Sequence, residues 1–458
     1  MIERVVAEKL QKQRDFFETN ITKDPGFRFR MLEKLKRAID KYELSLINAL
    51  KEDLGKSPFE AYISEIGIVK NELSFQLKHL RSWSRPRKVK TPLYHLISRS
   101  FICPEPYGLV LIIAPWNYPF NLLFTPLVGA LAAGNCVVLK PSNHSPVTSA
   151  LMEKLINETF DEHYVSIFQG GREMIQALLR EKFDYIFFSG SPAVGKVVME
   201  AASSNLTPVT LELGGKCPCI VDSDARIKRA GKRIAWGKFL NAGQSCIAPD
   251  YLLVNRDVKH TLLEALKESI KEFYGDNPEQ SPDYGRIINQ KHFDRLCNLM
   301  KKGEIIFGGK TKKESRYISP TIIDGVSPED PIMQEEIFGP LLPVVEFISL
   351  DEAISYVRER PKPLSLYFFS ESREKQERVL QTLSFGGGCI NDVVVHFASP
   401  YLPFGGIGTS GMGSYHGRAS FETFTHKKSI LKKSNLFDLA IRYAPYGEKL
   451  RRLKRFLK

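Results

Sequence analysis

The stretch LVLIIAPWNYPFNLLFTPLVGALAAGNCVVLKPS, residues 109–142, decides the fold. It begins with a short apolar run, LVLIIAP, continues with a longer apolar segment that ends in glycine, and closes with a second short run, NCVVLKPS. Short apolar runs are typical of buried strands, whereas a longer run is typical of a helix. A strand, a helix and a second strand in this order favour a parallel βαβ unit.

The same alternation continues on both sides of a glycine pair. YVSIFQG, YIFFSG and PVTLELGG are strand-like, and PAVGKVVMEAASS between them is helix-like. A second unit starts near Gly214, with CPCIVDSDA as strand and RIKRAGKRIAWGKFL as helix, and alternation runs to about Asn391. Residues 1–80 have the three-and-four spacing of helices. The sequence therefore predicts an α/β protein with two doubly wound parallel sheets and a boundary at residues 213–215.

Residues that could bind a ligand or react with it lie where the predicted strands end. Trp116 and Asn117 follow LVLIIAP, Lys140 ends NCVVLK, Gly190 ends YIFFSG and Glu212 ends PVTLE. In open parallel sheets, ligands bind beyond the carboxyl ends of the strands. We therefore expect these side chains to face a common ligand.

Composition restricts the class of protein. The chain has 458 residues, with 43% hydrophobic and 26% charged, which is typical of a folded protein of at least two domains. The seven cysteines suggest neither a disulfide framework nor a zinc site, and Cys217 and Cys219 are too close together for a usual metal-ligand pair. We predict no metal, two small residues in a buried strand at those positions, and a cytoplasmic location with reduced thiols.

Targeting and membrane-spanning segments are not predicted. The N-terminus, MIERVVAEKLQKQRDFF, is charged and lacks the apolar centre of a signal peptide. The most apolar region, residues 109–139, contains Pro115, Pro119 and Pro126 among polar residues. It is therefore a poor membrane span.

The positive charge is concentrated at the C-terminus. The whole chain has a net charge of +13, and residues 427–458 contain eleven Lys or Arg against two acidic residues. The final YGEKLRRLKRFLK places Leu450, Leu453, Phe456 and Leu457 among basic residues. Two interpretations stay open: weak peripheral contact with an anionic membrane, and a solvated terminal helix. No nucleic-acid recognition motif accompanies the charge, so no nucleic-acid partner is predicted.

Three side chains are candidates for catalysis, and each has a structural alternative. Cys246, in NAGQSCIAPD, is a potential nucleophile in a polar or electropositive setting, or a small core residue. Glu212, in LELGGK, is a potential general base if burial raises its pKa, or a carboxylate that caps the next segment. Asn117, in PWNYPF, can donate to an oxyanion or form a turn between prolines.

A glycine-bounded run predicts a possible anion site. GSPAVG, residues 190–195, opens a helix directly after a strand, which points free N–H groups at a ligand such as a pyrophosphate. The run is not the GxGxxG fingerprint, and glycine at a helix start is common. Dinucleotide binding and an ordinary helix start therefore both fit this run when it is taken alone.

Together these segments resemble one family. PWNYPF, VVLKPS, FFSGSPAVG, LELGGK, GQSC, EEIFGP and PFGGIGTSGMG occur in the order found in aldehyde dehydrogenases. The resemblance runs from about Met1 to about Ser429, and the ending VVVHFASPYLPFGGIGTSGMGSYHG looks most like the class 3 branch of fatty and aromatic aldehyde dehydrogenases. The pair formed by LELGGK and GQSC, separated by 34 residues, is its most specific element.

The resemblance implies a mechanism and a cofactor, NAD or NADP. Cys246 would attack the aldehyde, the Asn117 amide and the Cys246 backbone N–H would hold the oxyanion, and Glu212 would activate water to hydrolyse the thioester. The implied cofactor-binding residues are Lys140, Gly190, Ser191, Gly195, Glu336 and Phe338. The segment KPSNHS departs from the family pattern, because many members have Glu where this chain has Asn143. A carboxylate there would repel a 2′-phosphate, so Asn143 predicts that NADP is tolerated.

The resemblance also implies a domain plan, a partner and a substrate class. The implied plan is a cofactor-binding domain in residues 1–84 and 111–213, a catalytic domain in 214–393, oligomerisation segments in 85–110 and 394–425, and a basic tail in 426–458. A homodimer follows from the oligomerisation segments. Six aromatic residues leave two interpretations open: an apolar tunnel for medium-chain, long-chain or aromatic aldehydes, and rings that mostly belong to the core. They are Trp116, Tyr118, Phe120, Phe397, Tyr401 and Phe404. His416 either shapes that tunnel or is a structural histidine.

Three other functions are weighed against aldehyde oxidation. An acyl-CoA or acyl-phosphate reductase on the same fold would use Cys246 but would not need Glu212. A non-catalytic binding protein would not need to keep Asn117, Glu212, Cys246 and Glu336. A thiol esterase without a nucleotide would not explain the cofactor motifs, although esterase side activity would follow from Cys246.

Overall fold

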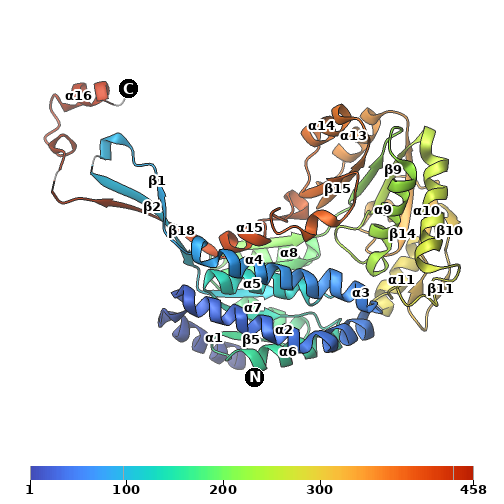
Figure 1. Cartoon of the computed structure of the whole chain (residues 1–458), viewed down its shortest axis with the longest axis horizontal. Coiled ribbons are helices and arrows are strands. Elements are labelled where there is room, and N and C mark those ends of the chain that lie inside the picture. The colour runs from blue at the N-terminus through green and yellow to red at the C-terminus, as the bar shows by residue number, and fades with distance from the viewer. Residues whose placement is uncertain (1, 96, 437, 457–458) are drawn as a thin grey trace.

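The computed structural model describes residues 2–95, 97–436 and 438–456, and contains two large parallel sheets and one smaller antiparallel sheet (Figure 1). The predicted α/β fold with two doubly wound sheets is confirmed. Both large sheets lie in the body of the molecule, whereas the small sheet extends away from it.

The first sheet has the strand order β17-β7-β6-β3-β4-β5, and its neighbours are parallel except for the β17–β7 pair. Its strands are β3 Leu109–Ile113, β4 Cys136–Lys140, β5 Val165–Ile167, β6 Tyr185–Gly190, β7 Val209–Leu213 and β17 Gly411–Met412. The surrounding helices are α1 Ile2–Glu18, α2 Pro25–Leu54, α3 Pro58–Ala61, α4 Gly67–Trp83, α5 Asn121–Ala133, α6 Pro146–Thr159, α7 Arg172–Arg180, α8 Pro192–Ser203 and α15 Gly417–Thr423.

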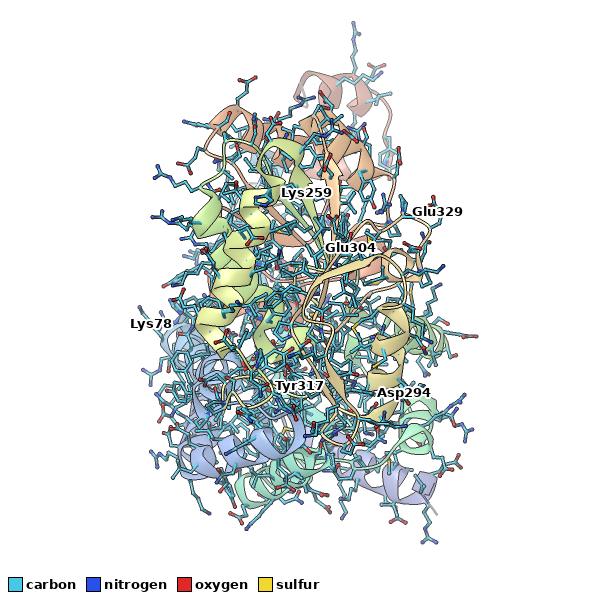
Figure 2. All side chains as sticks on the ribbon, turned by 90° about the vertical axis from the view of Figure 1, so that its right-hand side faces the viewer. Lys78, Lys259, Asp294, Glu304, Tyr317 and Glu329 are labelled. Atoms are coloured by element: carbon cyan, nitrogen blue, oxygen red, sulfur yellow. The ribbon has the colours of Figure 1, made fainter. Side chains whose placement is uncertain are left out.

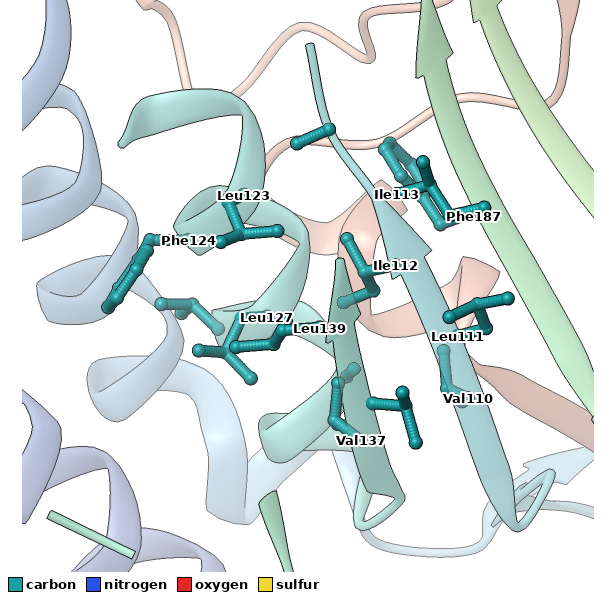
Figure 3. Packing of buried hydrophobic residues seen from close by; sticks show 14 of the residues in the cluster. Val110, Leu111, Ile112, Ile113, Leu123, Phe124, Leu127, Val137, Leu139 and Phe187 are labelled. Carbon is teal, nitrogen blue, oxygen red and sulfur yellow. The ribbon is translucent and has the colours of Figure 1, made fainter. Parts of the chain in front are cut away.

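The segment that decides the fold forms β3, α5 and β4, as predicted. Every residue of α5 is buried, because the helix lies against β3 and β4 and is covered on its other side by α2 and α4. Figure 3 shows Leu123 and Leu127 on the side of α5 that faces the two strands, and Phe124 on the opposite side of the helix. Apolar residues all around this helix therefore reflect burial inside a protein core.

The second sheet has the order β10-β13-β14-β9-β8-β15-β16 and is parallel except for β10. Its strands are β8 Pro218–Val221, β9 Tyr251–Asn255, β10 Glu304–Phe307, β13 Thr321–Asp324, β14 Leu341–Phe347, β15 Ser365–Phe369 and β16 Gly387–Ile390. Its helices are α9 Ile227–Phe239, α10 Lys259–Tyr274, α11 Gln290–Leu299, α12 Pro331–Gln334, α13 Leu350–Arg358 and α14 Arg373–Thr382. A short hairpin joins β11 Thr311–Lys312 to β12 Tyr317–Ile318.

The outer surface of this second unit is strongly charged. In Figure 2, which faces this side, charged side chains such as Lys259, Glu304 and Glu329 surround the ribbon. Lys259 pairs with Asp324 at 2.9 Å and with Glu346 at 3.5 Å. The buried cysteine pair fits the sequence interpretation, since Cys219 lies inside β8 and Cys217 lies just before it.

The small sheet forms an arm made of β1 Arg87–Val89, β2 Ser98–Pro106 and β18 Thr425–Lys433 (Figure 1). β18 pairs with β2 over nine residues. Residues 426–433, assigned to the basic tail from the sequence, thus form a strand, because backbone pairing with β2 is compatible with lysines on an exposed edge. Residues 109 and 110, assigned to the extension, lie in β3 of the first sheet.

The C-terminal segment returns to the first sheet before it enters the arm. β17 adds to the edge of β7, and α15 then packs on α4 and α5. Beyond the arm, α16 Lys449–Phe456 forms the terminal helix near the far end of the arm (Figure 1). Leu457, named in the tail from the sequence, lies outside the described residues. Among the described residues, no helix combines the length and apolar character needed to cross a membrane.

Candidate active site

Two cavities meet at Cys246 and Glu212. The first has a volume of about 260 Å³ and is lined mainly by apolar side chains from both large units. The second has a volume of about 300 Å³ and is lined by more polar groups. Cys246, Glu212, Leu122 and Ser189 line both cavities. The predicted nucleophile and the predicted base therefore stand at one junction, although 34 residues separate them in the chain.

A strained loop presents Cys246. After α9 ends at Phe239, Asn241, Ala242 and Gly243 adopt left-handed φ angles of 52°, 50° and 73°. A Cβ atom on Gly243 would lie 2.2 Å from the Gly339 carbonyl oxygen, so this position requires glycine. Two non-glycine residues in left-handed geometry are uncommon and persist only where surrounding contacts hold them.

Hydrogen bonds fix the backbone at Cys246 and at the residue that follows it. The Cys217 thiol donates to the Cys246 carbonyl oxygen at 3.2 Å, and the Tyr367 hydroxyl donates to the Ile247 carbonyl oxygen at 2.5 Å. Burial, with smaller contributions from the nearby Glu336 and Glu212 carboxyls, raises the pKa of the Cys246 thiol well above its usual range. Burial therefore favours the neutral form of this thiol at rest.

Glu212 lies inside strand β7 rather than at its end. Its backbone position is between Gly411 of β17 and Ser189 of β6, and β7 continues to Leu213. The side chain is 4% exposed, and neither carboxyl oxygen has a hydrogen-bond partner among the described residues. Burial raises the pKa of Glu212 well above its usual range. Such a carboxyl is a strong proton acceptor once ionised.

Asn117 lies directly beyond β3 and lines the second cavity. Its side-chain Nδ2 donates to the Gln244 carbonyl oxygen at 3.2 Å, in the loop that carries Cys246. An amide nitrogen carries two hydrogens, so a second N–H can serve a ligand. The loops of Asn117 and Cys246 are therefore in direct contact.

The glycine-bounded run begins a helix as predicted. β6 ends at Gly190, and the Ser191 hydroxyl caps α8 by accepting a hydrogen bond from the Val194 N–H at 3.5 Å. Gly190 and Ser191 both line the second cavity. Gly195 does not line it; a Cβ atom there would lie 2.6 Å from Leu213, so this glycine permits close packing of α8 on β7.

Lys140 ends β4 and is buried, but it does not line the second cavity. Its ammonium group donates to the Pro141 carbonyl oxygen at 2.5 Å, and burial lowers the pKa of Lys140 to about 8. Its predicted contact with the adenine ribose stays a prediction.

Glu336 reaches the second cavity across Gly214. A Cβ atom on Gly214 would lie 2.0 Å from Glu336 Oε2, so only glycine admits the carboxyl there. Glu336 Oε1 has no hydrogen-bond partner among the described residues, and burial together with Asp250 raises the pKa of Glu336 to about 8. Phe338 lines the same cavity, with its ring 5.3 Å from that of Trp116. A buried, unpaired carboxyl of this kind can accept hydroxyl donors.

Side chains not identified from the sequence complete this region. His292 and Arg295 of α11 line the second cavity. Arg295 donates to the carbonyl oxygens of Glu336 at 3.2 Å and Ile337 at 2.5 Å. Lys216 pairs with Asp250, which in turn accepts from the Ile337 N–H at 2.8 Å. These contacts hold the loop that carries Glu336; α11 has an ordinary amphipathic pattern, so no motif marked it in advance.

Three of the six aromatic residues predicted around a tunnel line the first cavity: Tyr118, Phe397 and Phe404. Trp116 lines the second cavity instead. Phe120 is fully buried, and Tyr401 is 76% exposed, so these two predictions are wrong. Sequence spacing does not reveal which face of a strand or turn an aromatic ring occupies.

His416 lies behind the wall of the first cavity. It is 3% exposed, and its ring packs 4.6 Å from Phe397 and 4.4 Å from Tyr415, both of which line the first cavity. Burial lowers the pKa of His416 to about 3. It is therefore a neutral histidine that supports the wall without lining it.

Metal-binding and disulfide chemistry find no support in the part of the chain that the structure describes. All seven cysteines are free there, and no group of three His, Cys, Asp or Glu side chains could hold a metal ion. The arrangement that the described residues do offer is a thiol, a carboxyl and an amide beside a polar cavity and an apolar one.

Comparison with known proteins identifies this arrangement. Residues 3–430 match the model of the aldehyde dehydrogenase family. The 4,4'-diaponeurosporen-aldehyde dehydrogenase of Staphylococcus aureus is 51% identical over 99% of both chains. Mouse aldehyde dehydrogenase family 3 member B3 is 48% identical over 98% of this chain and 94% of the relative. The rat dimeric NADP-preferring aldehyde dehydrogenase is 45% identical over 98% of this chain and 99% of the relative.

A solved structure agrees with these relatives. The substrate-bound state of Staphylococcus aureus AldH superposes with a TM-score of 0.97, at 51% identity and with 99% of both chains covered. The chain therefore belongs to the aldehyde dehydrogenase family and is an oxidoreductase that acts on aldehydes.

Proposed function

We propose that Cys246, Glu212 and Asn117 carry the oxidation of an aldehyde to a carboxylic acid through a thioester. The position of Cys246 and Glu212 at the junction of both cavities carries this proposal. The Cys246 thiol gives its proton to water, and the sulfur then adds to the aldehyde carbon. The Asn117 amide and the Cys246 backbone N–H stabilise the oxyanion that forms, and preorganised donors of this kind act best in a buried site.

Glu212 acts in the second half of the reaction. Once the carbon has lost hydride, the acyl group is bound to Cys246 as a thioester. Glu212 removes a proton from water, the resulting hydroxide adds to the thioester carbonyl, and the thiol leaves as the acid is released. Burial raises the pKa of the Glu212 carboxyl, and the raised basicity of the ionised carboxylate supports this role.

The family uses NAD or NADP as the hydride acceptor, and the second cavity fits such a group. The N-terminus of α8, capped by Ser191 next to Gly190, suits a pyrophosphate. The unpaired Glu336 Oε1 suits ribose hydroxyls, and the cavity wall includes Phe338 and Trp116 as apolar surfaces. When bound there, the oxidised nicotinamide supplies the acceptor for the hydride that leaves the substrate carbon.

Among aldehydes, we propose medium-chain, long-chain or aromatic substrates. The first cavity is lined by Trp236, Leu240, Phe397 and other apolar residues, and its only titratable carboxyl among the lining residues is Glu212. A straight-chain series from acetaldehyde to dodecanal should show kcat/KM rising with chain length, since each buried methylene contributes about 0.8 kcal/mol. A constant kcat/KM across the series would contradict this substrate class.

For the coenzyme, we propose that NADP is accepted alongside NAD. Asn143 is exposed and lies beside Gly171, so no carboxylate occupies the position that would repel a 2′-phosphate. The ratio of kcat/KM for the two coenzymes tests this idea. Asn143→Glu should shift the ratio toward NAD; a strong NAD preference that the substitution leaves unchanged would contradict it.

The assembly and the setting are proposals of the same kind. A homodimer formed through the arm is supported by the extension of β1, β2 and β18 from the body and by the dimeric rat relative. The exposed Leu436 and Leu450 and the basic residues near them support weak contact of the tail with an anionic membrane. The seven free cysteines support a reducing, cytoplasmic location. A monomeric mass in solution would contradict the dimer.

A further inference from the structure

A fully buried ion pair lies next to the segment that carries Asn117. Lys56 and Glu65 have 0% exposed side chains, and their charged atoms are 2.6 Å apart. In the sequence they are two ordinary charges in the stretch LGKSPFEAYISE that links helices. Removing two charges from water is costly, so a buried pair is weak evidence for a stabilising role and raises the question of what it holds in place.

The Lys56–Glu65 pair makes hydrogen bonds to the chain at Asn117 and at Asn121. The Lys56 ammonium donates to the Asn117 carbonyl oxygen at 3.0 Å and lies 4.0 Å from the centre of the Tyr118 ring. Glu65 Oε2 accepts from the Asn121 N–H at 2.8 Å, where α5 begins. The segment between β3 and α5 is therefore held by one charged pair at Asn117, in its middle, and at Asn121, where α5 begins.

A second donor ties the same turn to the nucleophile loop. The Asn241 side-chain Nδ2 donates to the Asn117 carbonyl oxygen at 2.8 Å and to the Gln244 carbonyl oxygen at 3.1 Å. Asn241 is one of the left-handed residues that precede Cys246. The Asn117 carbonyl oxygen thus accepts from Lys56 and from Asn241, while the Asn117 side chain donates to Gln244.

We propose that Lys56, held by Glu65, and Asn241 are positioning residues that set the Asn117 amide relative to Cys246 for oxyanion binding. This inference rests on the proposed role of Asn117. The three hydrogen bonds cross between chain segments more than 50 residues apart. Small errors in the placement of an oxyanion donor reduce catalysis strongly. Buried hydrogen bonds that hold the Asn117 segment in place would therefore support catalysis.

The test uses a reaction that needs the oxyanion site but no coenzyme. Acylation of Cys246 by p-nitrophenyl acetate passes through a tetrahedral oxyanion, whereas alkylation of the same thiol by iodoacetamide does not. In the paired variant Lys56→Met/Glu65→Gln, which removes both charges of the pair, we expect acylation to slow about 10- to 100-fold, as for a partly lost oxyanion donor. Alkylation should stay within about twofold of the wild-type rate. Equal slowing of both reactions would overturn the proposal.

A second variant guards against a failure to fold. Asn241→Gly removes the amide but retains a residue that tolerates the left-handed backbone. It should show the same selective loss of acylation. Lys70→Met is the matched control, because Lys70 pairs with Asp40 and Glu43 on α2 and has no hydrogen bond to the Asn117 turn. Both rates should be unchanged in the control; a selective acylation loss there would overturn the proposal.

A double-mutant cycle separates this inference from the role of Asn117 itself. In an Asn117→Ala background, the Lys56→Met/Glu65→Gln substitutions should slow acylation by less than about twofold, because the group they position is gone. The same fold-loss in both backgrounds would overturn the positioning role alone. No acylation loss in Asn117→Ala would overturn the oxyanion role of Asn117, and the positioning role with it.

Discussion

The two cavities that meet at Cys246 have opposite characters. The first is closed by apolar side chains such as Ile63, Trp236 and Phe404, drawn from helices and loops of both large units. The second is built from strand ends, loops and helix α11. It contains the unpaired carboxyl of Glu336 together with His292 and Arg295 of that helix. Apolar walls accept many chains of similar size, whereas buried polar groups that lack partners require a ligand that supplies them.

This difference in lining suits the two cavities to two different ligands, the aldehyde and the coenzyme. In the proposed mechanism the reacting bond forms at the junction, and the two ligands enter cavities that would select them by different forces. Loss of the shared Cys246 thiol should therefore stop both half-reactions, whereas loss of the shared Glu212 carboxyl should stop only the second. Loss of a residue from one cavity should weaken one ligand only. The predictions below test this division, beginning with the largest expected effect.

Replacement of the shared thiol should abolish turnover. For Cys246→Ala we expect aldehyde oxidation to fall by at least about 10⁴-fold, because the remaining hydroxyl at the junction, that of Ser189, is a much weaker nucleophile than a thiol. NADH binding, followed by its fluorescence, should change little, since the second cavity keeps its polar groups. Full turnover by this variant would remove the thioester route.

Substitutions confined to one cavity should affect one ligand. Gly214→Ala forces Glu336 away, because the new methyl group would lie 2.0 Å from the carboxyl oxygen. Loss of hydrogen bonds to a charged group costs about 1.5–3 kcal/mol, so KM for the coenzyme should rise about 10- to 100-fold. KM for the aldehyde should change less than about twofold.

The matched substitution in the apolar cavity is Phe397→Ala. It removes part of the wall and should lower kcat/KM for long alkanals about 10-fold or more, with little change for acetaldehyde. KM for the coenzyme should stay constant. If both substitutions changed both KM values equally, the two cavities would not be separate binding sites.

The pH dependence should show a smaller, graded effect. The pKa values of the Glu212 and Cys246 groups are both raised by burial, so the ionised forms needed for catalysis become more abundant as pH increases. The rate should therefore rise with pH, by up to about 10-fold per unit below the controlling pKa. Steady-state kcat measured from pH 6 to pH 9 checks this direction. A kcat that falls over this range would contradict it.

The sequence predicted much of this site because strand ends are visible in a sequence. The apolar run of β3 places Asn117, and the glycine after β6 places the start of α8. Those predictions rest on burial and turn chemistry, which act over a few residues. The position of Glu212 inside β7 was less visible, since the strand β17 that lies beside it comes from about 200 residues later in the chain.

The groups that support the catalytic residues were the least visible. Lys56 and Glu65 have the appearance of surface charges, and their burial becomes apparent only when α3, α5 and the Cys246 loop are packed together. The left-handed geometry of Asn241 and Ala242 is uncommon outside glycine, so local preference argues against it. Tertiary contacts decide both features, and the same applies to His292 and Arg295 of α11.

The covalent intermediate offers the most direct test of the account. Glu212→Gln, mixed with an aldehyde and NAD, should release one equivalent of NADH rapidly and then accumulate the acyl group on Cys246. Intact mass and peptide mapping should find the added acyl mass on that cysteine, with steady-state turnover reduced about 10²- to 10⁴-fold. Steady turnover at the wild-type rate without an adduct, or an adduct on a different cysteine, would contradict the central claim.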